Sequence, residues 1–534
     1  MSADELILAI DQGTTGTTVL VFGAAGDLRS RGYAELPQHF PRPGWVEHDA
    51  EEIWATTLAA LTRALDPLGD LRRRVVAIGL TNQRETALLW ERASSKPVAR
   101  AIVWQDRRTA ERCAALEREG AGREVASKTG LRLDPYFSST KLEWLLRSDP
   151  ALRGRARRGA LACGTVDAWL LWKLTGGRAH ATDFTNASRT MLFDIGRLRW
   201  DDDLLRRFGI PPAVLPEALP SIAAFGETRD VPGLEDGVPI RGIAGDQQAA
   251  LFGQGCATAG GLKNTYGTGC FLLLHTGGRR VRSRAGLLTT IACGPGGAPA
   301  YALEGSVFIA GAAIQWLRDG LGVLRDAAES EALARGVEDA GGTVLVPAFA
   351  GLGAPYWRPD ARGIWSGLTR GVTRAHLVRA ALESIAYQSR DVIEAMEREA
   401  RVRIRELRVD GGASQNRFLM QFQADISGVR LVRPGLVETT ALGAALLAGI
   451  GAGRWSAASD LQAVREPGAT FEPAMRRSER ERLYGRWREA VGLLVSARAP
   501  GRARRSASPR PRSGSRGPRA RSAPRGRARR TRGR

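Results

Sequence analysis

Short apolar runs that end in polar or glycine-rich turns recur along the chain. Residues 6–10, 75–80 and 238–243 are runs of this kind, and they are typical of buried β-strands. Residues 376–399 follow a near-helical period and predict the clearest amphipathic helix, while residues 50–65 predict another helix. This mixture is typical of an open α/β sheet, where ligands bind beyond the carboxyl ends of the strands.

Two predicted β-hairpins have tips made of glycine and threonine. The first tip lies within residues 11–18, and the second lies within residues 264–270. Backbone N–H groups and small hydroxyls at such tips can surround phosphate oxygens. A carboxylate beside them, here Asp11, is best explained by a bridging Mg²⁺. A plain turn is the alternative for each tip, but one such hairpin in each half of the chain favours phosphate binding.

Asp246 stands between the strand-like residues 238–243 and a helix-forming run at residues 247–252. One interpretation is a helix N-cap, whose carboxylate accepts hydrogen bonds from the first free N–H groups of the helix. The other is a catalytic acid or base, because the turn lies at the carboxyl end of a strand. The turn alone favours the N-cap, whereas the motifs elsewhere in the chain favour catalysis.

Polar residues follow further strand ends. Arg84 and Glu85 come after residues 75–80, and Trp104 ends an apolar run. An adjacent arginine and glutamate can donate to and accept from neighbouring hydroxyls, while an indole packs on C–H edges. A surface ion pair and a core tryptophan are the alternatives, favoured when each residue is taken singly. Late in the chain, Gly411 and Gly412 follow a strand and would let the backbone approach a ligand closely.

Length and cysteine usage narrow the class of protein. A chain of 534 residues is too long for one core and predicts two or three domains. It has no run of 18 apolar residues, and its acidic N-terminus is unlike a secretory signal. The five cysteines are scattered without a C-x-x-C pair, so we expect a reducing cytoplasm.

The formal charge of +22 is concentrated at the C-terminus. Residues 501–534 hold 14 Arg and no Asp, Glu or Lys, so 22 − 14 leaves +8 for residues 1–500. We expect this Arg-rich tail to be disordered, because its composition cannot bury enough apolar surface. Arg-rich segments can bind polyanions, but the tail has no aromatic residue for base stacking, and a solvated tail is the favoured interpretation.

Several motifs are absent from the sequence. It has no G-x-x-x-x-G-K-[ST] loop, no G-x-G-x-x-G after a strand, no paired histidine spacing and no G-x-S-x-G elbow. With these classes of enzyme excluded, the features left to explain are two phosphate-type hairpins and an acid at a strand-to-helix turn. These parts fit phosphoryl transfer from a nucleotide to a small hydroxylated molecule, a reaction that relies on positioning, charge neutralisation and a base.

In this order, the motifs resemble those of the FGGY carbohydrate kinases, most closely the glycerol-phosphorylating members. The resemblance runs from about residue 6 to residue 490 and rests on residues 11–15, 44–49, 81–86, 136–138, 245–253, 264–269 and 408–413. It implies an α/β fold of the two-domain actin/Hsp70/hexokinase type (ribonuclease H-like) with an interdomain cleft. The implied domains are a glycerol-binding N-terminal domain at residues 1–253 and a nucleotide-binding C-terminal domain at residues 254–497, followed by the tail at residues 498–534.

The resemblance also implies a reaction and its residues. The expected reaction is ATP-dependent phosphorylation of glycerol to sn-glycerol 3-phosphate, the first step of glycerol catabolism, with Asp246 as the general base. The residues implied for glycerol are Arg84, Glu85, Trp104, Tyr136, Asp246, Gln247 and Phe271. Those implied for ATP are Thr14, Thr15, Gly16, Thr268, Gly311, Gln315, Gly412 and Asn416, with Asp11 on the Mg²⁺ side. We further expect a homodimer or homotetramer, with no membrane partner and no nucleic acid bound by the folded body.

The chain departs from the family pattern at a few places. Thr18 stands where well-known bacterial members have an arginine, and residues 226–241 lack the glycine-rich basic loop that binds fructose 1,6-bisphosphate in some of them. The histidine that some members phosphorylate is also absent. A kinase for another polyol or a ketose is one alternative, which Trp104 disfavours. A non-catalytic ATP-binding scaffold with a nucleic-acid-binding tail is another, which Asp246 and the hydroxyl-binding residues disfavour.

Overall fold

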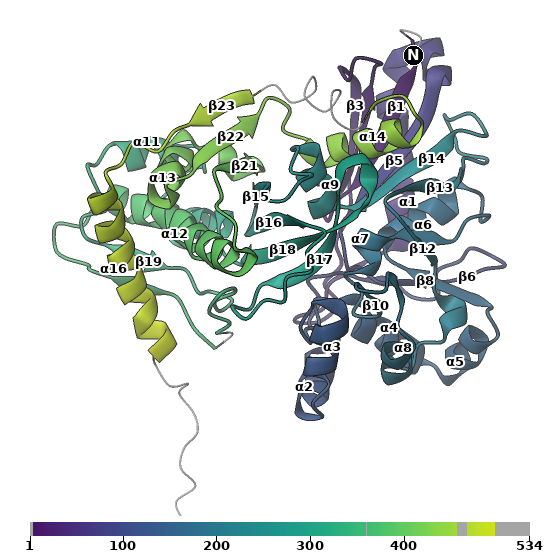
Figure 1. The fold of residues 1–534 in the computed structure, drawn as a ribbon, viewed down its shortest axis with the longest axis horizontal. Coiled ribbons are helices and arrows are strands. Elements are labelled where there is room, and N and C mark those ends of the chain that lie inside the picture. The colour runs from purple at the N-terminus through teal and green to yellow at the C-terminus, as the bar shows by residue number, and fades with distance from the viewer. Residues whose placement is uncertain (1–3, 359, 457–466, 497–534) are drawn as a thin grey trace, which may run out of the picture. The chain divides into compact units, whose positions relative to one another are not determined.

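Two large β-sheets, each with helices packed against it, organise the protein (Figure 1). The computed structural model describes residues 4–358, 360–456 and 467–496. The predicted tail at residues 498–534 lies outside the described residues, so its disorder stays a prediction. None of the helices in the described ranges is long and apolar enough to cross a membrane.

The first sheet is built from the N-terminal half of the chain. Its strands, in spatial order, are β13 (Ile222–Glu227), β14 (Pro239–Gly245), β5 (Val75–Asn82), β1 (Leu6–Gln12), β2 (Gly16–Phe22) and β3 (Leu28–Glu35). Strands β14, β5 and β1 run parallel, while β2, β3 and β13 are antiparallel to their neighbours. The parallel strands are almost wholly buried, which explains why they read as continuous apolar runs.

The second sheet repeats this arrangement with one more strand. Its spatial order is β17 (Leu288–Cys293), β18 (Pro299–Val307), β16 (Cys270–Gly277), β15 (Leu262–Tyr266), β21 (Glu406–Asp410), β22 (Arg430–Pro434) and β23 (Pro467–Phe471). Strands β15, β21 and β22 run parallel, as β1, β5 and β14 do. The two predicted hairpins are confirmed: they are β1–β2 and β15–β16, with tips at residues 13–15 and 267–269.

Short ladders and turns connect the larger elements. The short strands are β4 (Glu47–His48), β6 (Leu88–Glu91), β7 (Ala101–Ile102), β8 (Leu161–Gly164), β9 (Ala181–Asp183), β10 (Phe193–Asp194), β11 (Arg199–Trp200), β12 (Glu217–Leu219), β19 (Val344–Val346) and β20 (Ile364–Ser366). The 3₁₀-helices are η1 (Asp66–Arg74), η2 (Pro212–Val214), η3 (Pro295–Gly297) and η5 (Gly412–Gln415), and η4 (Trp316–Gly320) is a short π-helix.

The predicted helices are confirmed, with local signals at their starts. Asp49 caps α1 (Ala50–Leu65) by accepting from Glu51 N at 2.8 Å, and Thr373 with His376 forms a capping box on α12 (Arg374–Ala400). The other helices are α2 (Ala110–Arg118), α3 (Gly122–Thr129), α4 (Ser138–Ser148), α5 (Pro150–Arg157), α6 (Val166–Leu174), α7 (Phe184–Ala187), α8 (Asp202–Phe208), α9 (Asp246–Gly253), α10 (Gly311–Gln315), α11 (Glu329–Arg335), α13 (Arg417–Ser427), α14 (Thr439–Gly451) and α16 (Arg477–Ser496).

Helices α9 and α14 are exchanged between the halves of the chain. Helix α14 follows β22 of the second sheet but packs on β1, β5 and β14 of the first, where Figure 1 shows it beside the N-terminal strands. A Cβ atom at Gly79 would meet the carbonyl oxygen of Ala444, so the glycine permits this close packing. Conversely, α9 follows β14 but reaches β17, where Gln248 Nε2 donates to Ile291 O at 3.1 Å. Each half therefore completes the packing of the other.

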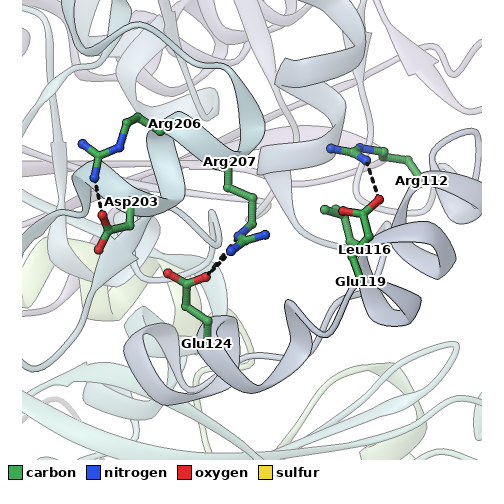
Figure 2. Close-up of a pocket in the computed structure, with 7 residues that line it drawn as sticks. All are labelled: Arg112, Leu116, Glu119, Glu124, Asp203, Arg206 and Arg207. Carbon is green, nitrogen blue, oxygen red and sulfur yellow. Dashed lines mark hydrogen bonds and ion pairs between the residues drawn. The ribbon is translucent and has the colours of Figure 1, made fainter.

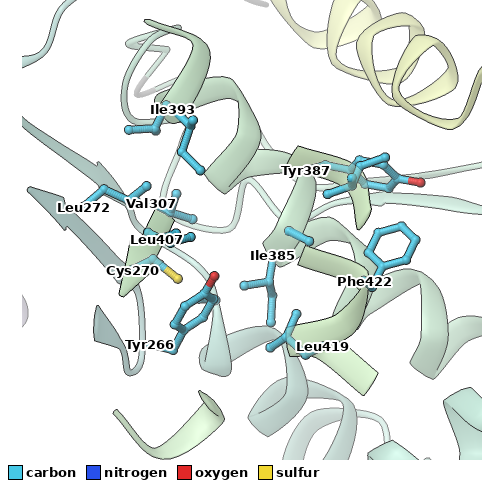
Figure 3. Close-up of a cluster of buried hydrophobic side chains, with 14 of the residues drawn as sticks. Tyr266, Cys270, Leu272, Val307, Ile385, Tyr387, Ile393, Leu407, Leu419 and Phe422 are labelled. Carbon is cyan, nitrogen blue, oxygen red and sulfur yellow. The ribbon is translucent and has the colours of Figure 1, made fainter. Parts of the chain in front are cut away.

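The core of the second half lies between its sheet and helices α12 and α13 (Figure 3). Ile385 and Leu419 of these helices are fully buried with Tyr266 of β15. The Tyr266 hydroxyl donates to Gln423 Oε1 at 2.9 Å, so this buried polar group is satisfied. The core thus holds the second hairpin at a defined place next to the candidate site.

Candidate active site

Asp246 begins helix α9 directly after strand β14. The N-cap residue is Gly245, and the one hydrogen bond assigned to the Asp246 carboxylate within the described residues comes from the adjacent Gln247 N, at 2.7 Å. The N-cap interpretation of Asp246 is therefore wrong, because the free N–H groups further along the first turn receive nothing from it. Its side chain is 30% exposed and lies 3.2 Å from Arg84 Nε, so this carboxylate is charge-paired and still reachable. A side chain at Gly245 would collide with the Arg84 stem.

Arg84 belongs to a buried ring of alternating charges with Glu304, Arg189 and Glu85. Arg84 Nη1 donates to Glu304 Oε2 at 2.7 Å, and Arg189 Nη2 donates to Glu304 Oε1 at 2.8 Å. Arg189 Nε donates to Glu85 Oε1 at 2.6 Å, and Arg84 Nε closes the ring 3.8 Å from the same oxygen. Each carboxylate has two arginine neighbours, which is how charges are tolerated away from water.

The pKa shifts in the ring follow from burial and pairing. Burial alone would raise the pKa of Glu304, but Arg189 and Arg84 outweigh it and lower that pKa to about 2. Burial raises the pKa of Glu85, against the opposing effect of Arg84 and Arg189. Of the two carboxylates, Glu304 is thus the one more strongly held in the ionised form, which can only accept hydrogen bonds.

Glu85 has a left-handed backbone, with φ of 63°. Its carbonyl oxygen accepts from Ser138 Oγ at 3.0 Å and from Lys141 Nζ at 3.4 Å, and Lys141 also donates to Tyr136 O at 2.6 Å. Such a conformation persists only where the surroundings hold it, and it is common at binding sites. Lys141 therefore ties the Glu85 turn to the segment that carries Tyr136.

Three aromatic rings form a wall beside these charges. The ring of Trp104 lies edge-on to Tyr136 at 5.6 Å and to Phe271 at 6.4 Å, measured between centroids. The Tyr136 hydroxyl lies 3.5 Å from Arg84 Nη2, and Trp104 Nε1 donates to Thr14 Oγ1 at 2.9 Å. The structure thus brings together the predicted substrate residues from both halves and links them to the first hairpin tip.

Lys263 is a buried cation that the sequence interpretation missed. Its ammonium donates to Gln247 Oε1 and, at 2.7 Å, to Thr265 Oγ1. Burial lowers the pKa of Lys263 to about 8, although Asp410 and Asp246 favour the charged form. Because an ammonium only donates, it turns the oxygen of the Gln247 amide toward itself and leaves the amide N–H groups for another acceptor.

The first hairpin brings Asp11 near Asp246. Burial, reinforced by the charges of Asp246 and Glu438, raises the pKa of Asp11 to about 8. Gly13 N donates to Gly16 O at 2.9 Å across the tip, and a Cβ atom at Gly16 would lie 2.6 Å from the Tyr33 ring. Thr15 is exposed at the tip, and Thr18 pairs with Asp11 in the hairpin register. A carboxylate crowded by two others is a place where a cation would be stabilised.

The second hairpin tip lies against the start of helix α10. Gly311 N donates to Gly267 O at 3.0 Å, and Ala312 N donates to Thr268 O at 3.1 Å. The pairing of Thr265 with Asp410 brings Gly412, just beyond the end of β21, to the same edge of the sheet as this tip. The predicted nucleotide residues Thr268, Gly311 and Gly412 therefore follow one sheet edge.

Two other predicted nucleotide residues are less closely tied to this edge. Asn416 caps α13 by accepting from Leu419 N at 2.9 Å and donates to Ser330 Oγ at 3.2 Å, so both ends of its amide are engaged. Gln315 is exposed on α10. Among the described residues, no hydrogen bond or ring contact joins either one to Asp246.

The residues that were missed carry a signal that local reasoning could have used. Glu304 is a single charge inside the mainly apolar strand β18, Lys263 is the single charge of the buried strand β15, and Arg189 lies in a short polar stretch before β10. A buried charge requires a partner, so each of these residues predicted an ion pair or a polar contact, but the sequence did not identify the partner residue.

Two surface cavities lie away from these residues. One of about 470 Å³ is formed on α2, α3 and α8, where Figure 2 shows Arg207 pointing to Glu124 and Arg206 to Asp203. Its charges are already paired. The other, of about 570 Å³, lies between β3 and α1 beside Tyr33 and Arg63.

Comparison with known proteins connects this geometry to a family. Residues 6–253 match the model of the N-terminal domain of the FGGY family of carbohydrate kinases, and residues 262–452 match that of the C-terminal domain. The chain is 53% identical to glycerol kinase 2 of Thermotoga maritima over 486 residues, which cover 91% of this chain and 98% of that one. It is 55% identical to a glycerol kinase of Symbiobacterium thermophilum over 485 residues, 91% of this chain and 97% of that one.

A solved structure of Plasmodium falciparum glycerol kinase with ADP superposes with a TM-score of 0.86 at 35% identity. The similarity covers 92% of this chain and 98% of that one.

Proposed function

Because the chain belongs to the FGGY family of carbohydrate kinases, we propose that it transfers the γ-phosphoryl group of ATP to a terminal hydroxyl of glycerol. The fold is the two-domain, actin- and hexokinase-like fold of that family. The names of the similar proteins, glycerol kinases at 53–55% identity, support glycerol as the acceptor and sn-glycerol 3-phosphate as the product.

The observation that carries the proposal is the grouping of Asp246 with Arg84, Glu85 and the aromatic wall. Within the described residues, the two hydrogen bonds of Arg84 Nη2 are long, 3.4 Å to Glu304 and 3.5 Å to the Tyr136 hydroxyl, so a substrate hydroxyl can replace one of them. Arg189 binds Oε1 of Glu85, while Oε2 has no assigned hydrogen bond within the described residues and can accept one. Donor, acceptor and aromatic faces within one site suit a small polyol.

In the proposed reaction Asp246 acts as the general base. Its carboxylate takes the proton of the attacking hydroxyl while that oxygen bonds to the γ-phosphorus of ATP. The bond from the γ-phosphorus to the bridging oxygen breaks, and ADP leaves with the electron pair. Arg84 holds the Asp246 carboxylate in place, and Gln247 presents its amide N–H groups to the substrate.

A magnesium ion fits the residues on the other side of Asp246. No group of three or more His, Cys, Asp or Glu forms a metal cluster in the described part of the chain. Mg²⁺ needs only one or two carboxylates when phosphates and water complete its shell, and Asp11 is a half-buried carboxylate without an assigned donor in the described residues. We assign Asp11 as its protein ligand; when bound, the ion would neutralise phosphate charge.

Thr14 and Thr15 of the first tip, Gly16 at the start of β2 and Thr268 of the second tip are proposed to contact the phosphates. Gly311, Gln315, Gly412 and Asn416 are proposed to border the nucleotide. The domain limits, the homodimer or homotetramer and the cytoplasmic location likewise remain predictions. Light scattering of the purified chain tests the assembly.

A panel of acceptors tests the function. ADP release is measured with glycerol, dihydroxyacetone, xylulose and gluconate at equal concentrations, and glycerol should give the highest kcat/KM. Preference for xylulose or gluconate would replace the proposal by its alternative, an FGGY kinase for a ketose or another polyol. ATP binding without turnover of any acceptor would favour the scaffold interpretation.

A further inference from the structure

Glu304 is a buried carboxylate that reaches the polyol residues from the other half of the chain. It lies on β18, paired with Leu273 of β16 and Leu288 of β17, and its side chain is fully buried. Its partner Arg84 is 220 residues away in sequence, just beyond the end of β5. The second sheet therefore contributes a charge to a site whose hydroxyl-binding residues come mainly from the first.

The contacts of Arg84 show what Glu304 does. Both oxygens of Glu304 face the guanidinium, at 2.7 Å from Nη1 and 3.4 Å from Nη2. Nε lies 3.2 Å from Asp246 Oδ1, and Nη1 also donates to Gln248 Oε1 at 3.2 Å. Because a guanidinium is planar, its contacts with Glu304 and Gln248 fix the orientation of the whole group. They therefore also fix the direction of the Nη2 N–H group that faces the Tyr136 hydroxyl.

Arg189 holds Glu304 from the opposite side and also binds Glu85. The same arginine thereby links the carboxylate that orients Arg84 to the carboxylate that is the proposed hydroxyl acceptor. Because all four side chains are buried, rotation of any one leaves a charge without its partner, which is costly away from water.

We propose that Glu304 is a positioning residue that determines specificity for polyols. It holds the Arg84 guanidinium so that Nη2 points to a non-reacting hydroxyl of the acceptor while Nε stays beside the Asp246 carboxylate. This inference rests on the proposed function, because it takes a polyol as the acceptor. It differs from a purely stabilising ion pair, which would affect all acceptors alike.

The test is Glu304→Gln, assayed with glycerol, 1,2-propanediol and 1,3-propanediol, each diol lacking one hydroxyl of glycerol. The amide keeps the size of the side chain but has one oxygen and no charge for two arginines. The wild type should prefer glycerol to both diols. The variant should lose that preference for at least one diol by on the order of 30-fold in the ratio of kcat/KM values. The loss should come mainly from a higher KM for glycerol.

Two further variants make the result specific. Glu304→Asp keeps the charge and should recover part of the preference. Glu143→Gln is a matched control on helix α4. Glu143 is also a buried carboxylate between two arginines, with Arg112 at 3.0 Å and Arg147 at 3.2 Å, and within the described residues it has no assigned contact with the ring of charges around Arg84. This control should leave the ratio unchanged.

An unchanged ratio in Glu304→Gln, or an equal change in Glu143→Gln, overturns the inference while leaving glycerol phosphorylation standing. If Glu304→Gln is insoluble, an unchanged ratio in Glu304→Asp overturns it instead. A wild type that does not phosphorylate glycerol overturns the proposed function and this inference with it.

Discussion

The two halves of the protein share one arrangement of strands but place different chemistry on it. In each, a hairpin with a glycine and threonine tip lies beside a parallel strand, β5 next to β1 and β21 next to β15. At matching positions of the register, Asp11 pairs with Thr81 in the first half and Thr265 pairs with Asp410 in the second. The acid therefore lies on the hairpin strand β1 in the first half and on the neighbouring parallel strand β21 in the second.

The segments that follow the parallel strands differ more. After β5 come the side chains of Arg84 and Glu85, packed into a buried charged ring. After β21 come Gly411 and Gly412, and a Cβ atom at Gly412 would meet nothing within 4 Å. The first half offers side chains to its ligand and the second half offers open backbone. This difference suits a small polyol on one side and a large nucleotide on the other.

The largest effect is expected at Asp246, the proposed base of the first half. Asp246→Asn keeps the size of the side chain and removes its basicity, so kcat should fall by about 10²–10⁴-fold. ADP release with saturating glycerol measures the fall, and ATP binding should persist. Asp236→Asn, at a surface pair 3.0 Å from Arg229, is the matched control and should turn over normally. Comparable activity of the two variants would remove Asp246 as the base.

The buried charges of the first half should also make its stability depend on pH. Burial lowers the pKa of Lys141 from 10.5 to about 7, although Glu85 and Asp106 oppose the shift. Between these values the unfolded chain binds more protons than the folded chain, so the free energy of unfolding rises with pH. Relative to Lys141→Met, the wild type should gain on the order of 4 kcal/mol between pH 7 and pH 10. Urea unfolding of both proteins measures the gain, and a difference that stays constant with pH would contradict the lowered pKa of Lys141.

The two adjacent glycines of the second half should respond differently to substitution, one through the stability of the fold and the other through ATP binding. Gly411 has φ of 84°, and a Cβ atom there would lie 2.4 Å from Tyr266 O, so Gly411→Ala should destabilise the fold by roughly 1–3 kcal/mol. Gly412→Ala should leave stability nearly unchanged and raise KM for ATP. Thermal unfolding and ATP titration separate the two. An unchanged KM for ATP in Gly412→Ala would argue against a nucleotide over this turn.

The smallest effect is expected where the first hairpin contacts the polyol residues. Thr14→Val removes the acceptor for Trp104 Nε1 and should weaken glycerol binding by about 1 kcal/mol, a several-fold rise in KM. Thr15→Val alters the exposed neighbour at the same tip and should change KM for ATP instead. If both variants affect only ATP, the hairpin serves the phosphates alone.

Local signals in the chain predicted much of this fold. The apolar runs before residues 11, 81 and 246 predicted β1, β5 and β14, and the near-helical period of residues 376–399 predicted α12 within two residues at each end. Such signals work because strand and helix periods are set by neighbouring residues. The motif at Asp246 identified a strand-to-helix turn that could carry a catalytic residue. The N-cap alternative for Asp246 is wrong, since capping depends on the direction of the side chain.

The amino-acid sequence by itself determined the strands, the helices, the two hairpins and the kinds of residue at each strand end. The tertiary structure alone decided which charges meet: Glu304 with Arg84, Arg189 with Glu85, and Lys263 with Gln247. It also decided that α14 packs on the first sheet. The reason is physical. A buried charge specifies that it needs a partner, but strands far apart in sequence must lie side by side before that partner is fixed.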